Sequence, residues 1–238
     1  MHGWHSPRIG RHMGVVVYGH WGPPLLAFPT SGGDEREMEG QGLIPALADF
    51  IDSGRVKVFT VNALTQEGFW NKGAHPFHRS WVQSVYASYI RQEVIPFIHD
   101  HCRGLVPVTT MGMSLGAYHA ANTLLKYPDA VKRCFALSGV YDLSSFMDGM
   151  YDDNFYFNNP AHYVPNLHDP WTFQQLETCD IHLATGNGPY ENSGPTYHFS
   201  GILASKGIRH SLDDWGPLGG HDWPYWKHQM REYLGKYY

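Results

Sequence analysis

Short apolar runs alternate with amphipathic segments along most of the chain. The runs have the length and β-branched content of strands, and in the longest segment between them apolar residues recur at near-helical spacing. This alternation is typical of a mostly parallel sheet with helices on both faces. The pattern therefore predicts an α/β fold.

The expected elements follow this rhythm from residue 13 onward. We expect strands at residues 13–20, 24–30, 56–63, 106–112, 133–139, 181–186 and 209–214. We expect helices at residues 42–54, 81–102, 117–128, 200–208 and 223–238. Pro96 lies inside the second helix, where a kink or local adjustment is expected because proline cannot donate the helical hydrogen bond.

Residues 141–176 break the pattern. The stretch is dense in Asn, Asp, Tyr and Phe, and it predicts an irregular insertion over one end of the sheet. Its aromatic residues either form the wall of an acyl or alcohol pocket or simply cover the core; they are Phe146, Tyr151, Phe155, Tyr156, Phe157 and Trp171. A length of 238 residues suits one domain that includes this insertion, spanning residues 1–238.

Composition narrows the classes of partner and compartment. The formal charge of −5 offers no broad basic field, so nucleic acid is not expected as a partner. The three cysteines, Cys102, Cys134 and Cys179, are widely spaced and odd in number, which argues for a reducing compartment without a disulfide framework. No signal peptide or run of about 18 apolar residues is present, so we expect a cytoplasmic protein with no membrane partner.

A serine between two glycines marks the junction of the strand at 106–112 with the next helix. Ser114 lies between Gly112 and Gly116 in the stretch GMSLG. A nucleophile at a tight strand-to-helix turn needs tiny neighbours, and the helix N-terminus favours negative charge beside it. Serine also commonly caps helices, which is the alternative role here. The strand, the two glycines and the partners considered next favour Ser114 as a catalytic nucleophile.

A nucleophilic serine requires a histidine base and a carboxylate that orients it, in the chain order serine, acid, histidine. His221 is the best-placed base, because it occupies a Gly-rich loop between the last strand and the last helix. The other histidines considered after Ser114 lie within expected helices or strands: His119, His182 and His228.

The orienting acid should lie on the loop after the strand at 181–186. Glu191 is the only carboxylate of that loop, although an exposed loop glutamate is the alternative. Asp142, Asp213 and Asp214 remain open as other candidates. Asp222 is expected to cap the terminal helix, because adjacent residues rarely direct their side chains at each other.

Three stretches together resemble a known family: GMSLG after one strand, SGVYD after the next, and GGHDWPYWKHQMREYL at the end. They resemble the α/β-hydrolase superfamily, in particular the esterase family that includes esterase D-like and enterochelin-esterase-like enzymes. The resemblance extends from about Val15 to Leu234, and it implies Ser114 as nucleophile and His221 as base. Many relatives carry an Asp after the penultimate strand, where this chain has GNGPYE, so the resemblance does not extend to the acid and Glu191 is expected from its place on the loop alone.

An acyl-transfer mechanism also needs two N–H donors at the developing oxyanion. Leu115, directly after the nucleophile, is expected to supply one. Gly32 or Gly33, on the loop after the strand at 24–30, is expected to supply the other, unless these residues only form a glycine turn.

These residues predict a serine carboxylic-ester hydrolase that forms an acyl-enzyme on a small, partly polar ester, with no cofactor. Two alternatives stay open: an acyltransferase that uses the same residues, separable by acceptor-dependent product ratios, and a non-catalytic binding protein on the same fold. No metal is expected, because no histidines have the His-Glu-x-x-His arrangement, including His2, His5, His12, His75, His78, His99 and His101. The oligomeric state stays open.

Overall fold

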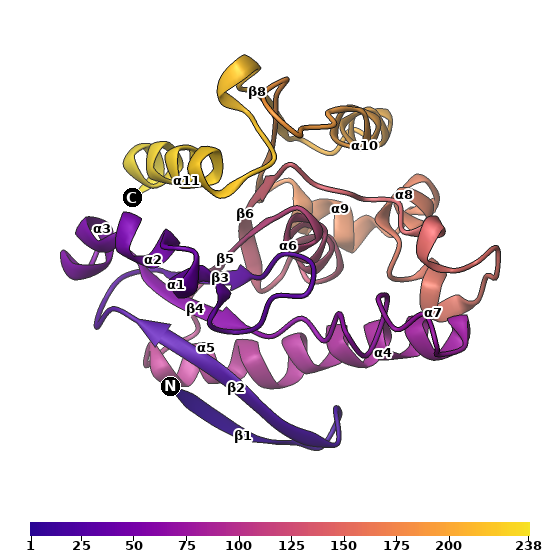
Figure 1. Ribbon diagram of the computed structural model, residues 1–238, viewed down its shortest axis with the longest axis horizontal. Helices are drawn as coiled ribbons and strands as arrows, with labels where there is room; N and C mark the ends of the chain where they lie inside the picture. The colour runs from indigo at the N-terminus through magenta and orange to yellow at the C-terminus, as the bar shows by residue number, and fades with distance from the viewer.

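An eight-stranded sheet runs through the middle of the protein, as a computed structural model of residues 1–238 shows (Figure 1). The strand order is β1-β2-β4-β3-β5-β6-β7-β8. The strands are β1 His2–Ser6, β2 Arg11–Tyr18, β3 Pro24–Phe28, β4 Lys57–Val61, β5 Val108–Met113, β6 Val131–Leu137, β7 Asp180–Thr185 and β8 Ser211–Asp214. From β4 to β8 all neighbours are parallel, whereas β1 and β2 pair antiparallel at one edge. The mostly parallel sheet predicted from the sequence is confirmed.

Helices cover both faces of this sheet. They are α1 Glu37–Gly40, α2 Leu43–Ala46, α3 Ala48–Asp52, α4 Pro76–Tyr89, α5 Ile95–His101, α6 Leu115–Lys126, α7 Asp153–Tyr156, α8 Pro160–Tyr163, α9 Pro170–Leu176, α10 Gly194–Ser205 and α11 Trp223–Tyr237. In Figure 1, α3 and α11 lie on one side of the sheet, and α4, α6 and α10 lie on the other. None of the helices combines the length and hydropathy that crossing a lipid bilayer requires.

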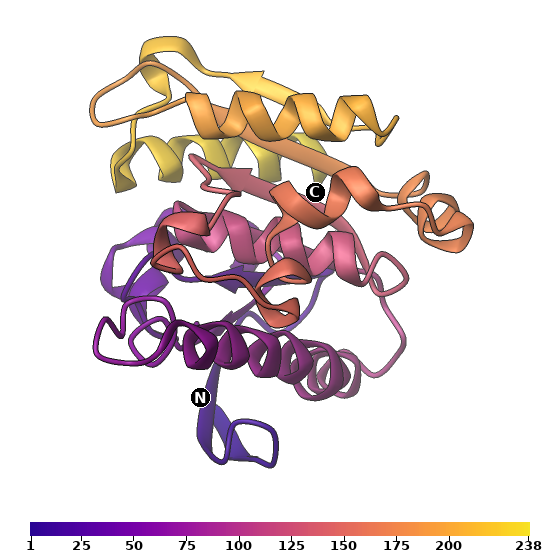
Figure 2. The same cartoon turned by 90° about the vertical axis from the view of Figure 1, so that its right-hand side faces the viewer.

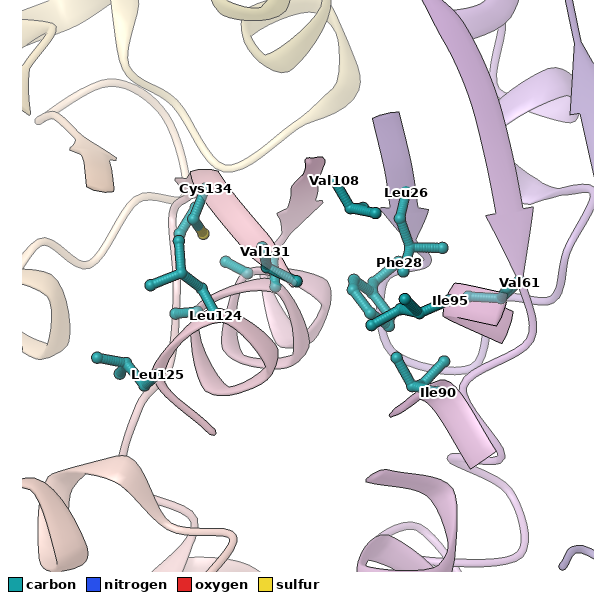
Figure 3. Close-up of a cluster of buried hydrophobic side chains, with 14 of the residues drawn as sticks. Leu26, Phe28, Val61, Ile90, Ile95, Val108, Leu124, Leu125, Val131 and Cys134 are labelled. Atoms are coloured by element: carbon teal, nitrogen blue, oxygen red, sulfur yellow. The ribbon is translucent and has the colours of Figure 1, made fainter. Parts of the chain in front are cut away.

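Alternate residues of the strands supply two separate cores, because successive side chains of a strand point to opposite faces. In β3, Leu25 and Ala27 pack with α3 and α11, whereas Leu26 and Phe28 pack with α4, α5 and α6. Figure 3 shows the second core, in which Phe28 lies beside Ile95 of α5. Burial on both faces explains why these strands read as unbroken apolar runs.

The structure differs from the sequence prediction at several elements. β1 was not expected, because only its last residue, Ser6, is buried and no apolar alternation marks the strand. The helix expected at 42–54 is two short helices, α2 and α3. The helix expected at 200–208 begins earlier, at Gly194. Pro195 does not prevent this, because proline is tolerated in the first turn of a helix.

The long helix adjusts just before Pro96. Residues Ile90–Val94 form a π-helical segment between α4 and α5, and it ends two residues before the proline. A proline ring clashes with the carbonyl four residues earlier, and a wider turn relieves that clash. The adjustment expected at Pro96 is therefore present, in the form of a π-helical turn.

The stretch 141–176 contains the short helices α7, α8 and α9, so it is more regular than predicted. Figure 2 shows it on the outside of α4 and α6. Arg79 of α4 pins it in place, because its buried guanidinium pairs with Asp148 at 2.8 Å and donates to the carbonyl of Phe146. Phe155 is buried against Leu115, so this aromatic residue covers the core. Tyr151, Phe157 and Trp171 are each about half exposed.

Candidate active site

Ser114 occupies the turn between β5 and α6 in a strained backbone conformation. Its φ is 56° and its ψ is −121°, a region that residues other than glycine rarely adopt. A Cβ at Gly112 would overlap the carbonyl of Gly116, and a Cβ at Gly116 would lie 2.5 Å from the carbonyl oxygen of Phe28. Both glycines are thus required by the close approach of strand and helix, as the sequence predicted.

The Ser114 side chain makes no capping hydrogen bond to α6. The hydroxyl of Ser114 therefore does not cap the helix, which was the alternative role for this serine. Leu115 is the first residue of α6, so its N–H has no acceptor within the helix and points, with the positive end of the helix dipole, toward the turn. The hydroxyl lies where negative charge is stabilised.

His221 and Glu191 face each other at the same edge of the sheet. His221 Nδ1 lies 3.6 Å from Oε2 of Glu191, whose side chain is only 1% exposed, whereas the histidine side chain is 33% exposed. This separation is slightly longer than a hydrogen bond. The backbone of His221 is also tied to the loop that carries Glu191, because its N–H donates to the carbonyl of Pro189 at 2.9 Å.

The two residues meet because the loops after β7 and β8 are joined through their backbones. The N–H of Asn187 donates to the carbonyl of Gly216, and the N–H of Gly188 donates to that of Gly219. A Cβ at Gly188 would lie 2.8 Å from the carbonyl oxygen of Pro217, so the approach requires glycine. The glycines of GNGP and GPLGG therefore bring Glu191 and His221 together.

Glu191 is held as a carboxylate in a nearly buried position. Its Oε1 accepts a hydrogen bond from Thr185 Oγ1 at 3.0 Å. Burial by itself would raise the pKa of Glu191, but interactions with His221, Ser138 and Thr185 outweigh it and leave the pKa below its ordinary value. A buried anion beside an imidazole stabilises the imidazolium form of that ring.

The other acids considered from the sequence have different partners. Asp142 accepts hydrogen bonds from Ser144 and Asn159 within the insertion. Asp213 accepts from Tyr233, and Asp214 accepts from Tyr197. Asp222 accepts from the Trp223 N–H and caps α11, as expected.

The histidines set aside in the sequence are also engaged elsewhere. His119 of α6 is buried beside Phe28 and Tyr118. His182 of β7 lies between Asp180 and Asp213, with nitrogen-to-oxygen distances of 3.0 and 3.4 Å. His228 of α11 is exposed and contacts the edge of Trp215.

The loop after β3 is organised by Glu37. Thr30 donates to this carboxylate through both its N–H and its hydroxyl. The N–H of Gly33 donates to the carbonyl of Thr30 within the turn, so this N–H is already used. Gly32 has a φ of 80° and packs against Trp70, and its N–H makes no hydrogen bond within the protein. Of the two glycines, Gly32 is thus the one with an available donor.

Sequence reasoning assigned no role to two residues beside the His221–Glu191 pair, Ser138 and Trp226. Ser138 follows β6 with a φ of 52°, and its Oγ accepts a hydrogen bond from Nε1 of Trp226 at 3.0 Å. The Trp226 ring also packs edge-on against His221. The second tryptophan of the GHDWPYW stretch was visible in the sequence, but its partner on another strand was not.

The protein has no disulfide, because all three cysteines are unpaired. No group of three His, Cys, Asp or Glu side chains converges in a way that could hold a metal ion.

Comparisons with known proteins bear on this arrangement. A family model described as "Putative esterase" matches residues 27–237. Curated protein sequences gave no match. Many solved structures are similar to this chain.

A ferulic acid esterase has 16% identity and a TM-score of 0.75, over 98% of this chain and 95% of that chain. An S-formylglutathione hydrolase from Agrobacterium tumefaciens has 15% identity and a TM-score of 0.73, over 98% and 92%. The fluorophosphonate-binding serine hydrolase FphF of Staphylococcus aureus has 18% identity and a TM-score of 0.68, over 98% and 95%. These structures share the α/β-hydrolase fold with this chain, and the family match spans most of the sequence, so the chain belongs to this esterase family.

Proposed function

We propose that the protein hydrolyses small carboxylic esters through an acyl-enzyme formed on Ser114. His221 removes the hydroxyl proton as Oγ attacks the ester carbonyl, and Glu191 orients the imidazole and stabilises its cation. The same histidine then gives its proton to the departing alcohol. The single observation that supports this most strongly is the uncapped hydroxyl of Ser114 on a strained turn, at the sheet edge where Glu191 faces His221.

Two backbone donors stabilise the oxyanion in this proposal. They are the N–H of Leu115, at the start of α6, and the N–H of Gly32, on the loop that Glu37 holds. Hydrolysis of the acyl-enzyme repeats the sequence with water: His221 takes a proton from water, the hydroxide attacks the acyl carbonyl, and Ser114 leaves with the proton. No step requires a metal or an organic cofactor.

Covalent labelling tests the proposal. A fluorophosphonate probe should add to Ser114 in the wild-type protein, with the adduct located by peptide mass spectrometry. Ser114→Ala should not be labelled and should not hydrolyse p-nitrophenyl acetate, while circular dichroism shows an intact fold. Ser144→Ala, which changes an exposed serine of the insertion, serves as the matched control and should label normally. Labelling of Ser114→Ala at another residue would overturn the assignment.

A further inference from the structure

A cavity lies at the opposite end of the sheet from Ser114. It has a volume of about 680 Å³ and is lined at its rim and floor by His20, Trp21, Lys57, His101 and Arg103. Lys57 begins β4, Pro24 begins β3, and Val108 begins β5, so the cavity opens at the amino ends of the parallel strands. The residues proposed for ester hydrolysis follow the carboxyl ends, so the two sites are separate.

The floor of this cavity holds a buried cation with no acid partner. Lys57 is 5% exposed, and neither Lys57 nor Arg103 takes part in any ion pair of the protein. The Lys57 ammonium contacts only the carbonyls of His20 and His101, at 3.5 and 3.4 Å. Two long contacts to neutral carbonyls do not compensate a full charge removed from water. Lys57 is therefore a charged group that lacks its counter-ion.

The remaining walls add donors and further positive charge. None of the cavity residues is an Asp or Glu, although acids outnumber Lys and Arg in the chain by 22 to 17. The backbone N–H groups of His20, Trp21 and Gly22 donate no hydrogen bond within the protein. Nδ1 of His101 is buried and has no partner either. Burial, the charge of Lys57 and the nearby His2 lower the pKa of His101.

We propose that this cavity binds a small oxyanion, such as phosphate or a phosphomonoester. Lys57 would neutralise the anion from the floor, Arg103 would reach it from the rim, and the free backbone N–H groups would donate to its oxygens. Trp21, which is 72% exposed at the rim, would pack against the organic part of a larger ligand.

Isothermal titration calorimetry at constant low ionic strength tests this, with inorganic phosphate and phenyl phosphate as probes. Each probe should bind saturably with one site per chain. Tighter binding of phenyl phosphate would assign the site to a phosphomonoester and the rim to its organic group, whereas equal binding would assign it to the free oxyanion. Absence of saturable binding by both probes would overturn the proposal.

Variants locate the site. Lys57→Met should weaken phosphate binding by about tenfold or more, the loss typical of one charge-assisted hydrogen bond. Lys57 also donates to a carbonyl at the end of α5, so its replacement could disturb the fold as well as the site. Arg103→Gln changes an exposed side chain, leaves the fold intact and should also weaken binding. Arg209→Gln changes an exposed, unpaired arginine just before β8 and should bind as wild type. Unchanged affinity in both Lys57→Met and Arg103→Gln would place the anion elsewhere and overturn the proposal.

Discussion

Nδ1 of His221 lies 3.6 Å from Oε2 of Glu191, an oxygen that is buried and makes no hydrogen bond. An unpartnered buried carboxylate oxygen is costly, and the imidazole is the group beside it that can donate to it. The pair is therefore poised to close into a hydrogen bond through the Nδ1–H of the imidazole.

Glu191→Gln should lower kcat by about 10³- to 10⁴-fold, because an amide can donate to Nδ1 and thereby favour the wrong tautomer of His221. Steady-state hydrolysis of p-nitrophenyl acetate measures the change. Glu232→Gln, on the exposed face of α11, is the matched control and should retain wild-type rates. A Glu191→Gln rate close to wild type would show that another acid serves His221.

Glu37→Gln should lower kcat while KM changes little, because Glu37 holds the Thr30 end of the loop that carries Gly32. Since Glu37 acts only through that loop, the loss should not exceed the roughly 10²- to 10³-fold cost of removing an oxyanion donor. Glu39→Gln changes the exposed acid two residues along the same short helix and should have no such effect. A rise in KM with constant kcat would instead indicate a role for Glu37 in substrate binding.

Gly116→Ala should destabilise the protein by about 1–3 kcal/mol or more, because the added methyl group would lie 2.5 Å from the carbonyl oxygen of Phe28. Urea denaturation measures the free energy of unfolding. Gly235→Ala in α11 is the contrasting variant: its added methyl group meets no atom within 4 Å, and alanine should stabilise the helix by about 0.5–1 kcal/mol. Equal stability of the two variants would contradict the close strand-to-helix approach.

The free energy of unfolding should fall as the pH is lowered from about 6.5 toward 3, partly because of His119. Burial lowers the pKa of His119 from 6.5 to about 3. In that window the unfolded state binds a proton that the folded state does not, so this residue reduces stability by up to about 1.4 kcal/mol per pH unit. His119→Leu should make the pH dependence shallower, as measured by urea denaturation at pH 7 and pH 5. His228→Leu, an exposed histidine, should retain the wild-type slope.

Local sequence patterns determined the parallel strands, most of the helices and the serine turn. These features depend on residues close together in the chain: apolar runs for strands buried on both faces, and Gly112 and Gly116 around Ser114. β1 escaped prediction because an exposed edge strand has no apolar face to reveal it. The insertion was described only as irregular, because its short helices are held by Arg79 and by the core beneath them.

Only the tertiary structure shows which of Glu191, Asp142, Asp213 and Asp214 faces His221. All four acids lie at the end of a strand or after one, and sequence order alone does not say which loops touch. The backbone hydrogen bonds between the loops after β7 and β8 bring Glu191 to His221, while Tyr233 and Tyr197 engage the two nearer acids. The same holds for Lys57, whose missing counter-ion is visible only when residues 19–24 and 101–107 enclose it. Contacts between distant segments depend on packing, and packing is a property of the whole fold.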